Sequence, residues 1–197
     1  MKQQINLNKQ MLYFFLVSVF TLLLSGNLFA MQNVSGVISL SAKKLFITIN
    51  NKTYPLQADN QETFDQMRKF DNGDLVSGSG QFVADGTRFS LVSIDFVGLN
   101  KLLGWWRINS NFYMNFRDFA NVSYISTSST ATKTNDFKYA VAPDEEMSVK
   151  TWRLFLTDSS SVHIGTLFLK ENQAKIQLYD GETGLPSQVI DLLKVKK

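Results

Sequence analysis

Residues 71–96 read DNGDLVSGSGQFVADGTRFSLVSIDF and contain two predicted strands joined by a tight turn. The first strand, LVSGSGQFV, places Gly78 and Gly80 on the same face as Val76. Two glycines on one face remove the side chains where a strand bends sharply or where another backbone comes close. The stretch therefore predicts a strongly curved strand. Asp85-Gly86 predicts the hairpin turn, and RFSLVSIDF is the returning strand.

Three shorter strands are predicted ahead of this hairpin. VSGVISL begins at Val34, LFITI begins at Leu45, and TYPLQ begins at Thr53. Asn50-Asn51 predicts the turn between the second and third of them, because asparagine tolerates positive φ.

A short helix is predicted between the third and fourth strands. Asp59 or Asn60 can cap its start. Phe64, Met67 and Phe70 lie three residues apart and therefore share one helical face. Because so short a helix is marginal by itself, we expect this face to pack against the sheet.

Three strands, a helix and two strands follow one another in the order of an OB-fold, a five-stranded, partly open barrel. Residues 34–99 resemble this fold, and most of all the small secreted OB domains of bacteria, whose fourth strand typically opens with Gly-Asp-x-Val. Here that run is Gly73-Asp74-Leu75-Val76, followed by Gly78 and Gly80. The resemblance implies that the glycines let the strand curl around a small barrel and that the helix closes its end.

The same resemblance implies a ligand site on the second and third strands and in two neighbouring loops. The residues at these places are Lys43, Lys44, Phe46, Tyr54 and Arg88. Aromatic rings flanked by bases can stack on and hold a nucleotide or a sugar. The alternative, which the scatter of the five positions favours, is two ordinary strand aromatics and a solvated basic rim.

Residues 101–197 predict a second, antiparallel β domain. Strand patterns follow one another with short turns between them, which predicts a meander that forms either a sandwich or an up-and-down barrel. Residues 126–136, STSSTATKTND, are polar and unpatterned and predict a loop. The linker 97–103 is short and apolar, so we expect the two domains to pack against each other.

Gly104-Trp105-Trp106 opens this second domain. A Gly-x-Trp near the start of a small meander barrel resembles the lipocalin-like superfamily, in which the tryptophan closes one end of the core. Simple alternation predicts one indole in the core and the other at the surface or the domain junction. A ligand cage or a membrane contact formed by Trp105 and Trp106 is the alternative.

The first thirty residues have the parts of a secretory signal peptide. Lys2 and Lys9 precede an apolar run from Met11 to Gly26, and a small residue, Ala30, follows. We expect cleavage after Ala30 and a periplasmic or secreted protein; an uncleaved membrane anchor is the alternative. The absence of cysteine fits a secreted domain with a sufficient core of its own.

Charge and composition argue against several classes of function. The net charge is +3, and Lys2 and Lys9 contribute most of it, so the remaining chain lacks the basic excess that nucleic-acid binding needs. His163 is the single histidine, and no Gly-x-Ser-x-Gly nucleophile motif accompanies it. One histidine without thiols makes a poor zinc site. We therefore predict no catalytic residue, metal or cofactor.

Acidic residues offer the remaining catalytic possibility. Asp144-Glu145-Glu146 reads as an exposed strand lead-in, and Asp180 and Glu182 lie in a predicted turn. A carboxylate pair drawn from these residues would suit a glycan hydrolase.

The combined features predict a mostly β, non-catalytic binding or adaptor protein of the bacterial envelope that acts through a protein partner. The alternative function is a carrier or sensor of a small apolar ligand or saccharide, and a glycan hydrolase is the third. An interior cavity would favour the carrier, an exposed apolar patch the adaptor, and facing carboxylates in a cleft the hydrolase.

Overall fold

The computed structural model describes residues 31–83, 86–144 and 151–196. The predicted signal segment with its cleavage site at Ala30, and also Asp85, Glu145 and Glu146, lie outside the described residues. Within those three ranges, no helix is long and apolar enough to cross a membrane.

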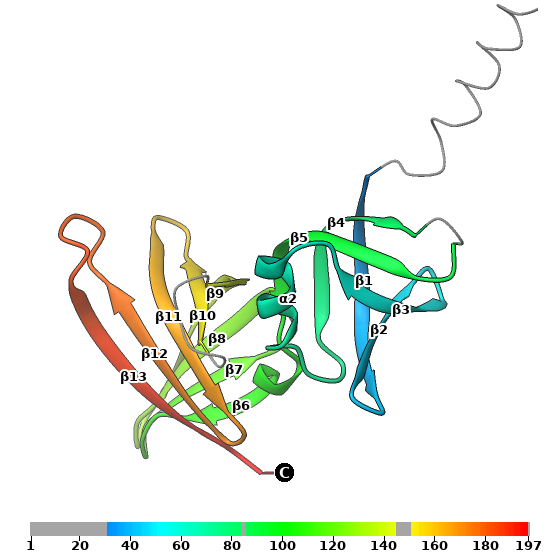
Figure 1. Ribbon diagram of the computed structural model, residues 1–197. Coiled ribbons are helices and arrows are strands. Elements are labelled where there is room, and N and C mark those ends of the chain that lie inside the picture. The colour runs from blue at the N-terminus through cyan, green and yellow to red at the C-terminus, as the bar shows by residue number, and fades with distance from the viewer. Residues whose placement is uncertain (1–30, 84–85, 145–150, 197) are drawn as a thin grey trace, which may run out of the picture.

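The N-terminal half is a five-stranded mixed sheet in the order β1-β2-β3-β5-β4 (Figure 1). Its elements are β1 (Gln32–Ser41), β2 (Lys44–Ile49), β3 (Lys52–Ala58), β4 (Leu75–Phe82), β5 (Phe89–Gly98) and the helix α2 (Gln61–Met67) between β3 and β4. The β3–β5 pairing is parallel and the other pairings are antiparallel. Because β1 pairs with both β2 and β4, the strand order returns to its start.

The glycines of β4 lie where this sheet is most tightly curved. Gly78 and Gly80 are buried on the same face as Val76, and the β4–β5 register shifts beside each glycine. A Cβ on Gly78 would collide with the carbonyl oxygen of Ser93, and a Cβ on Gly80 with that of Ser90. The strand therefore bends where only a glycine backbone can pass its neighbour, as the sequence predicted.

The helix buries a different face from the predicted one. Met67 and Phe70 are buried, but the Phe64 side chain is 50% exposed, so that part of the prediction was wrong. Thr63 points inward instead, where its hydroxyl donates to the Val92 carbonyl at 2.7 Å, and Asn60 caps the helix by accepting from the Thr63 amide at 2.8 Å. This polar anchor on β5 sets the rotation of the helix.

The C-terminal half is a closed antiparallel barrel of eight strands (Figure 1). Its strands are β6 (Gly104–Arg107), β7 (Phe112–Phe116), β8 (Asn121–Thr127), β9 (Thr132–Pro143), β10 (Thr151–Thr157), β11 (Val162–Lys170), β12 (Gln173–Tyr179) and β13 (Pro186–Lys194). Each strand pairs with the next along the chain, and β13 pairs with β6. Of the two predicted arrangements, the meander therefore forms the barrel and not the sandwich.

Part of the predicted loop 126–136 is strand. β9 begins at Thr132 and pairs with β8 over Thr132–Lys138, where its side chains are almost all exposed. Because both faces of this extension are polar and meet solvent, the apolar alternation that reveals a strand is missing there.

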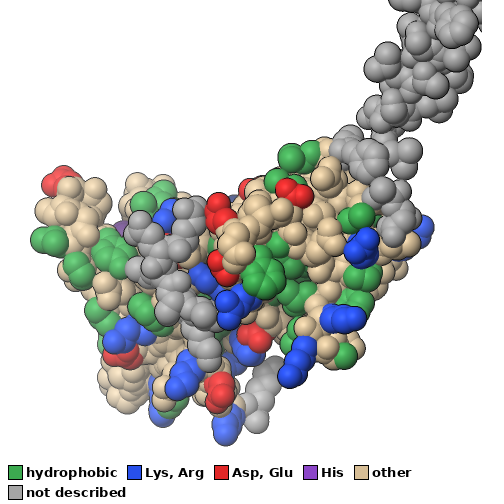
Figure 2. All heavy atoms as spheres, viewed as in Figure 1, with side chains coloured by type: hydrophobic (Ala, Val, Ile, Leu, Met, Phe, Trp, Pro, Cys, Tyr) green, Lys and Arg blue, Asp and Glu red, His purple; other side chains and the backbone are tan. Residues whose placement is uncertain are grey.

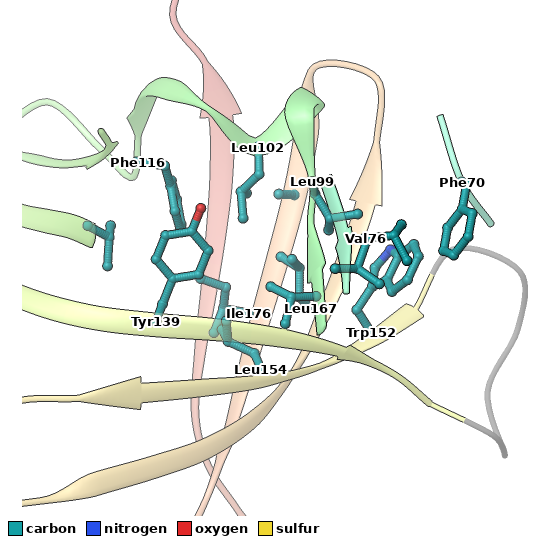
Figure 3. Packing of buried hydrophobic residues seen from close by; sticks show 14 of the residues in the cluster. Phe70, Val76, Leu99, Leu102, Phe116, Tyr139, Trp152, Leu154, Leu167 and Ile176 are labelled. Carbon is teal, nitrogen blue, oxygen red and sulfur yellow. The ribbon is translucent and has the colours of Figure 1, made fainter. Parts of the chain in front are cut away.

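The two halves share one continuous core. A 3₁₀ turn (η1, Asn100–Leu102) links them, and Leu99 and Leu102 are both buried. Figure 3 shows Trp152 of the barrel beside Val76 of the N-terminal sheet, with Leu99 nearby. The packed junction expected from the apolar linker is therefore present.

Substitution of Gly78 by alanine should destabilise the protein by about 2–3 kcal/mol, because the added methyl forces β4 away from β5. Gly181→Ala is the matched control, since a Cβ there meets no atom within 4 Å, and its effect should stay within about 0.5 kcal/mol. Urea unfolding followed by circular dichroism measures both. Equal stability of the two variants would contradict the role assigned to Gly78.

Candidate functional site

The barrel closes through a short seam between β13 and β6. Only two residue pairs join these strands, Leu193 with Arg107 and Lys194 with Trp106. The Val195 amide adds a hydrogen bond to the Trp105 carbonyl at 2.9 Å. Because β6 ends at Arg107, the part of β13 before Leu193 has no β6 residue to pair with.

One cluster holds this seam and the linker together. The Trp106 indole is fully buried and donates to the Leu102 carbonyl at 2.7 Å. The Lys194 ammonium lies 4.9 Å from the centre of that ring and donates to the carbonyls of Lys101 and Leu103. Burial lowers the pKa of Lys194. A cation over an indole with backbone acceptors around it is a stable arrangement for a half-buried lysine.

An open groove of about 960 Å³ lies beside the seam. It runs over the outward residues of β11, β12 and β13 and ends against the β6–β7 turn at Asn109 and Ser110. Phe168 and Leu193 supply exposed apolar surface to it, at 39% and 43% exposure. Figure 2 shows hydrophobic side chains on the surface over these strands. No local pattern in the sequence predicts this groove, because it forms where β6 and the β6–β7 turn meet β11, β12 and β13, which are about 60 residues further along the chain.

The groove carries an excess of positive charge. Arg107, Lys170 and Lys175 line it together with one carboxylate, Asp191. Lys175 lies 3.8 Å from Asp191, whereas Arg107 and Lys170 form no ion pair within the described ranges. Two exposed cations beside apolar side chains suit a ligand that is partly acidic and partly apolar.

The structure separates the aromatics of the predicted OB site. Phe46 lies opposite Pro55 and Tyr54 opposite the buried Ile47, which puts the two rings on opposite faces of the sheet. The Tyr54 ring packs inward, 4.9 Å from the Phe82 ring.

The basic residues of that predicted site are exposed. Lys43 lies in the β1–β2 turn with φ +63°, Lys44 opens β2, and Arg88 lies just before β5. Within the described part of the chain, no hydrogen bond, ion pair or ring contact links these three side chains to Phe46 or Tyr54.

The two neighbouring tryptophans alternate as predicted. Trp106 is a core residue, and Trp105 on the next position is 43% exposed on the outer face of β6. The two indoles therefore point to opposite sides of the barrel wall and do not form one cage.

The β10–β11 turn brings a serine, a histidine and an aspartate together. Ser161 Oγ lies 3.0 Å from His163 Nε2, but the same hydroxyl donates to Asp158 Oδ1 at 3.1 Å. Backbone hydrogen bonds from Ser160 and Ser161 lower the pKa of Asp158 to about 2. Asp158 Oδ2 lies 3.8 Å from the same ring nitrogen, Nε2, that faces Ser161, whereas in a catalytic triad the aspartate and the serine face different nitrogens of the imidazole.

A smaller cleft of about 210 Å³ at the junction contains buried charge. Both oxygens of Asp74 accept backbone N–H bonds, from Asp71 at 2.7 Å and from Asn100 at 2.8 Å. Asp71 itself pairs with Lys101 at 2.8 Å. These carboxylates of the cleft are engaged within the protein, where they join the β4 lead-in to the linker.

Lys69 lines the same cleft and contacts Asp144. The Lys69 ammonium donates to the Asp144 carbonyl at 2.8 Å and lies 5.7 Å from the centre of the Trp152 ring. Burial lowers the pKa of Lys69. The Asp144 carboxylate lies 3.8 Å from Arg153 and is largely buried, so it is not the exposed strand lead-in that the sequence predicted.

The remaining acidic turn is exposed. Asp180 accepts from the Thr183 amide at 2.8 Å, which is turn chemistry. Among the described residues, no group of three histidine or acidic side chains lies close enough to hold a metal ion.

Comparisons with protein-family models, with curated proteins and with solved structures found no match.

Replacement of Lys194 by methionine should lower the free energy of unfolding by about 1–3 kcal/mol, because two linker carbonyls lose their donor. The exposed Lys196 offers the control, and Lys196→Met should change stability by less than about 0.5 kcal/mol. Hydrogen exchange at the Arg107 amide, which faces β13, should rise in the first variant alone. Unchanged exchange there would show that Lys194 does not hold the seam.

Stability should fall as the pH rises from about 4 to about 6 through the titration of Asp74. Burial raises the pKa of this carboxyl to about 6, so the folded protein binds the proton more tightly than the unfolded chain does. Deprotonation then removes up to about 3 kcal/mol of stability. Urea unfolding at several pH values, with Asp74→Asn as the reference, isolates this contribution. Parallel pH profiles of the two proteins would contradict it.

Proposed function

We propose that this chain is a non-catalytic binding or adaptor protein of the bacterial envelope that contacts a protein partner through the seam groove. The observation that carries the proposal is the open groove with its exposed apolar residues, Phe168 and Leu193, and its exposed cations, Arg107 and Lys170. An open, mixed surface suits a segment of a protein better than a small molecule, which is usually enclosed on most sides.

The barrel interior supports a partner over an enclosed ligand. Trp106, Phe116, Leu154, Leu167 and Ile176 fill its centre, each at most 1% exposed. A carrier needs empty volume where these side chains pack. The groove, on the outer face, is therefore the better candidate for recognition.

The family resemblances belong to the same proposal. The order β1-β2-β3-β5-β4, with a parallel β3–β5 pair and α2 between β3 and β4, supports an OB-type N-terminal domain. An eight-stranded meander whose first strand buries Trp106 supports a lipocalin-like C-terminal domain. The apolar segment before Gly26 supports export across the inner membrane.

Site-specific photo-crosslinking in cells tests this function. The photo-reactive analogue p-benzoylphenylalanine replaces Phe168 in the groove, and in a second protein it replaces Phe64 of α2, which is similarly exposed at 50%. We expect one dominant envelope protein to be captured from position 168 and not from position 64. Arg107→Glu should reduce the capture at least about fivefold, because it reverses a charge that lines the groove.

Two outcomes would reject the proposal. Equal capture from both positions would indicate nonspecific contact. Absence of any captured protein at position 168 would move the function to the carrier of a small ligand, and a thermal-shift screen of lipids, saccharides and nucleotides would then identify its class.

A further inference from the structure

We propose that the partner binds by β-strand addition: an extended segment with an acidic residue pairs with the free edge of β13 along Ser187–Asp191. The inference rests on the proposed function and names the binding mode and the chemistry of the partner segment. The edge is a backbone feature, distinct from the side chains that line the groove.

Hydrogen-bond directions identify the free backbone groups. The Lys194 amide donates to the Asn172 carbonyl at 2.8 Å, toward β12, and the Val195 amide donates to the Trp105 carbonyl, toward β6. Because these directions alternate along a strand, the amides and carbonyls of Val189 and Asp191 also face the β6 side. β6 has ended by then, and among the residues that the structure describes, none pairs with this side of β13.

The edge is open to a partner. The Val189 side chain is 51% exposed and the Asp191 side chain 78% exposed, and all of residues 181–189 are exposed. Figure 1 places the β12–β13 hairpin on the side of the barrel away from the N-terminal sheet. A strand edge with unpaired N–H and C=O groups is a template for a further strand, and proteins use such edges to bind extended peptides.

Charge selects the kind of segment. A strand on this edge begins beside Arg107 at the end of β6, so an acidic residue at that end gains a favourable contact. The Asp191 carboxylate of β13 already lies 3.8 Å from Lys175 of β12, on the other side of β13. An apolar residue in the segment can contact Val189 or Leu193 on the outer face. Because Arg107 lies at one end of this edge, we assign the edge to an acidic segment of a different protein. Self-association of the chain that Val189→Pro abolishes would instead assign the edge to a second copy and overturn this choice.

A displayed library of random peptides, each long enough to form one strand, tests this mode on the folded chain. We expect enriched peptides to alternate apolar and polar residues and to contain Asp or Glu. Val189→Pro removes one edge amide, and proline is tolerated at an edge position whose N–H faces outward. This substitution should lower the affinity for the enriched peptides at least about tenfold, because one backbone hydrogen bond and the register around it are lost.

Val189→Thr is the matched control, since it keeps the amide and the branched shape, and it should weaken binding by less than about threefold. Peptides methylated at single backbone nitrogens give a second test that does not depend on the folding of a variant. Methylation at every second residue should abolish binding, and methylation at the residues between should not.

Any of three outcomes would overturn strand addition. The library could enrich no peptide, the enriched peptides could bind the Val189→Pro protein equally well, or they could tolerate methylation at both sets of residues. The photo-crosslink at Phe168 separates the two proposals. If the Val189→Pro protein still captures the partner there, the groove binds through side chains alone, and the proposed function stands without strand addition.

Discussion

The contact between Lys194, Trp106 and the linker carbonyls holds the two main features of the molecule in place. Lys194 lies on the last strand of the barrel, β13, and Trp106 lies on the first, β6. Leu102 lies in the linker to the N-terminal sheet. The buried indole donates to the linker, and the ammonium donates to two further linker carbonyls. Barrel closure and domain packing therefore depend on the same few groups, and the seam can be short because this cluster supports it.

That short seam creates the candidate site. A longer β6 would pair with all of β13, and both the free edge and the wall of the groove would disappear. The N-terminal sheet acts as the support on the opposite side, since its core continues into the barrel through Leu99 and Trp152. A rigid support with an open strand edge fits recognition of an extended chain, which must lose its own conformational freedom on binding.

Three carboxylates that could take part in chemistry instead form hydrogen bonds within the protein. Asp74 accepts from two backbone amides, Asp158 caps the β10–β11 turn just before His163, and Asp180 caps another turn. These backbone hydrogen bonds fix each carboxylate as part of a turn or of the linker. By contrast, the groove cations Arg107 and Lys170 are exposed, so they can select an acidic partner.

Local signals in the sequence determined the strands, the curvature at Gly78 and the burial of one of two adjacent tryptophans, because alternation and glycine sterics act over a few residues. The tertiary structure decided the rest. The polar half of β9 is a strand because β8 pairs with it, and α2 turns Thr63 inward because Val92 offers an acceptor. The separation of Phe46 from Tyr54, the barrel in place of a sandwich, and the groove all follow from register between distant strands. Register depends on pairings across the whole chain, and no single stretch of residues contains it.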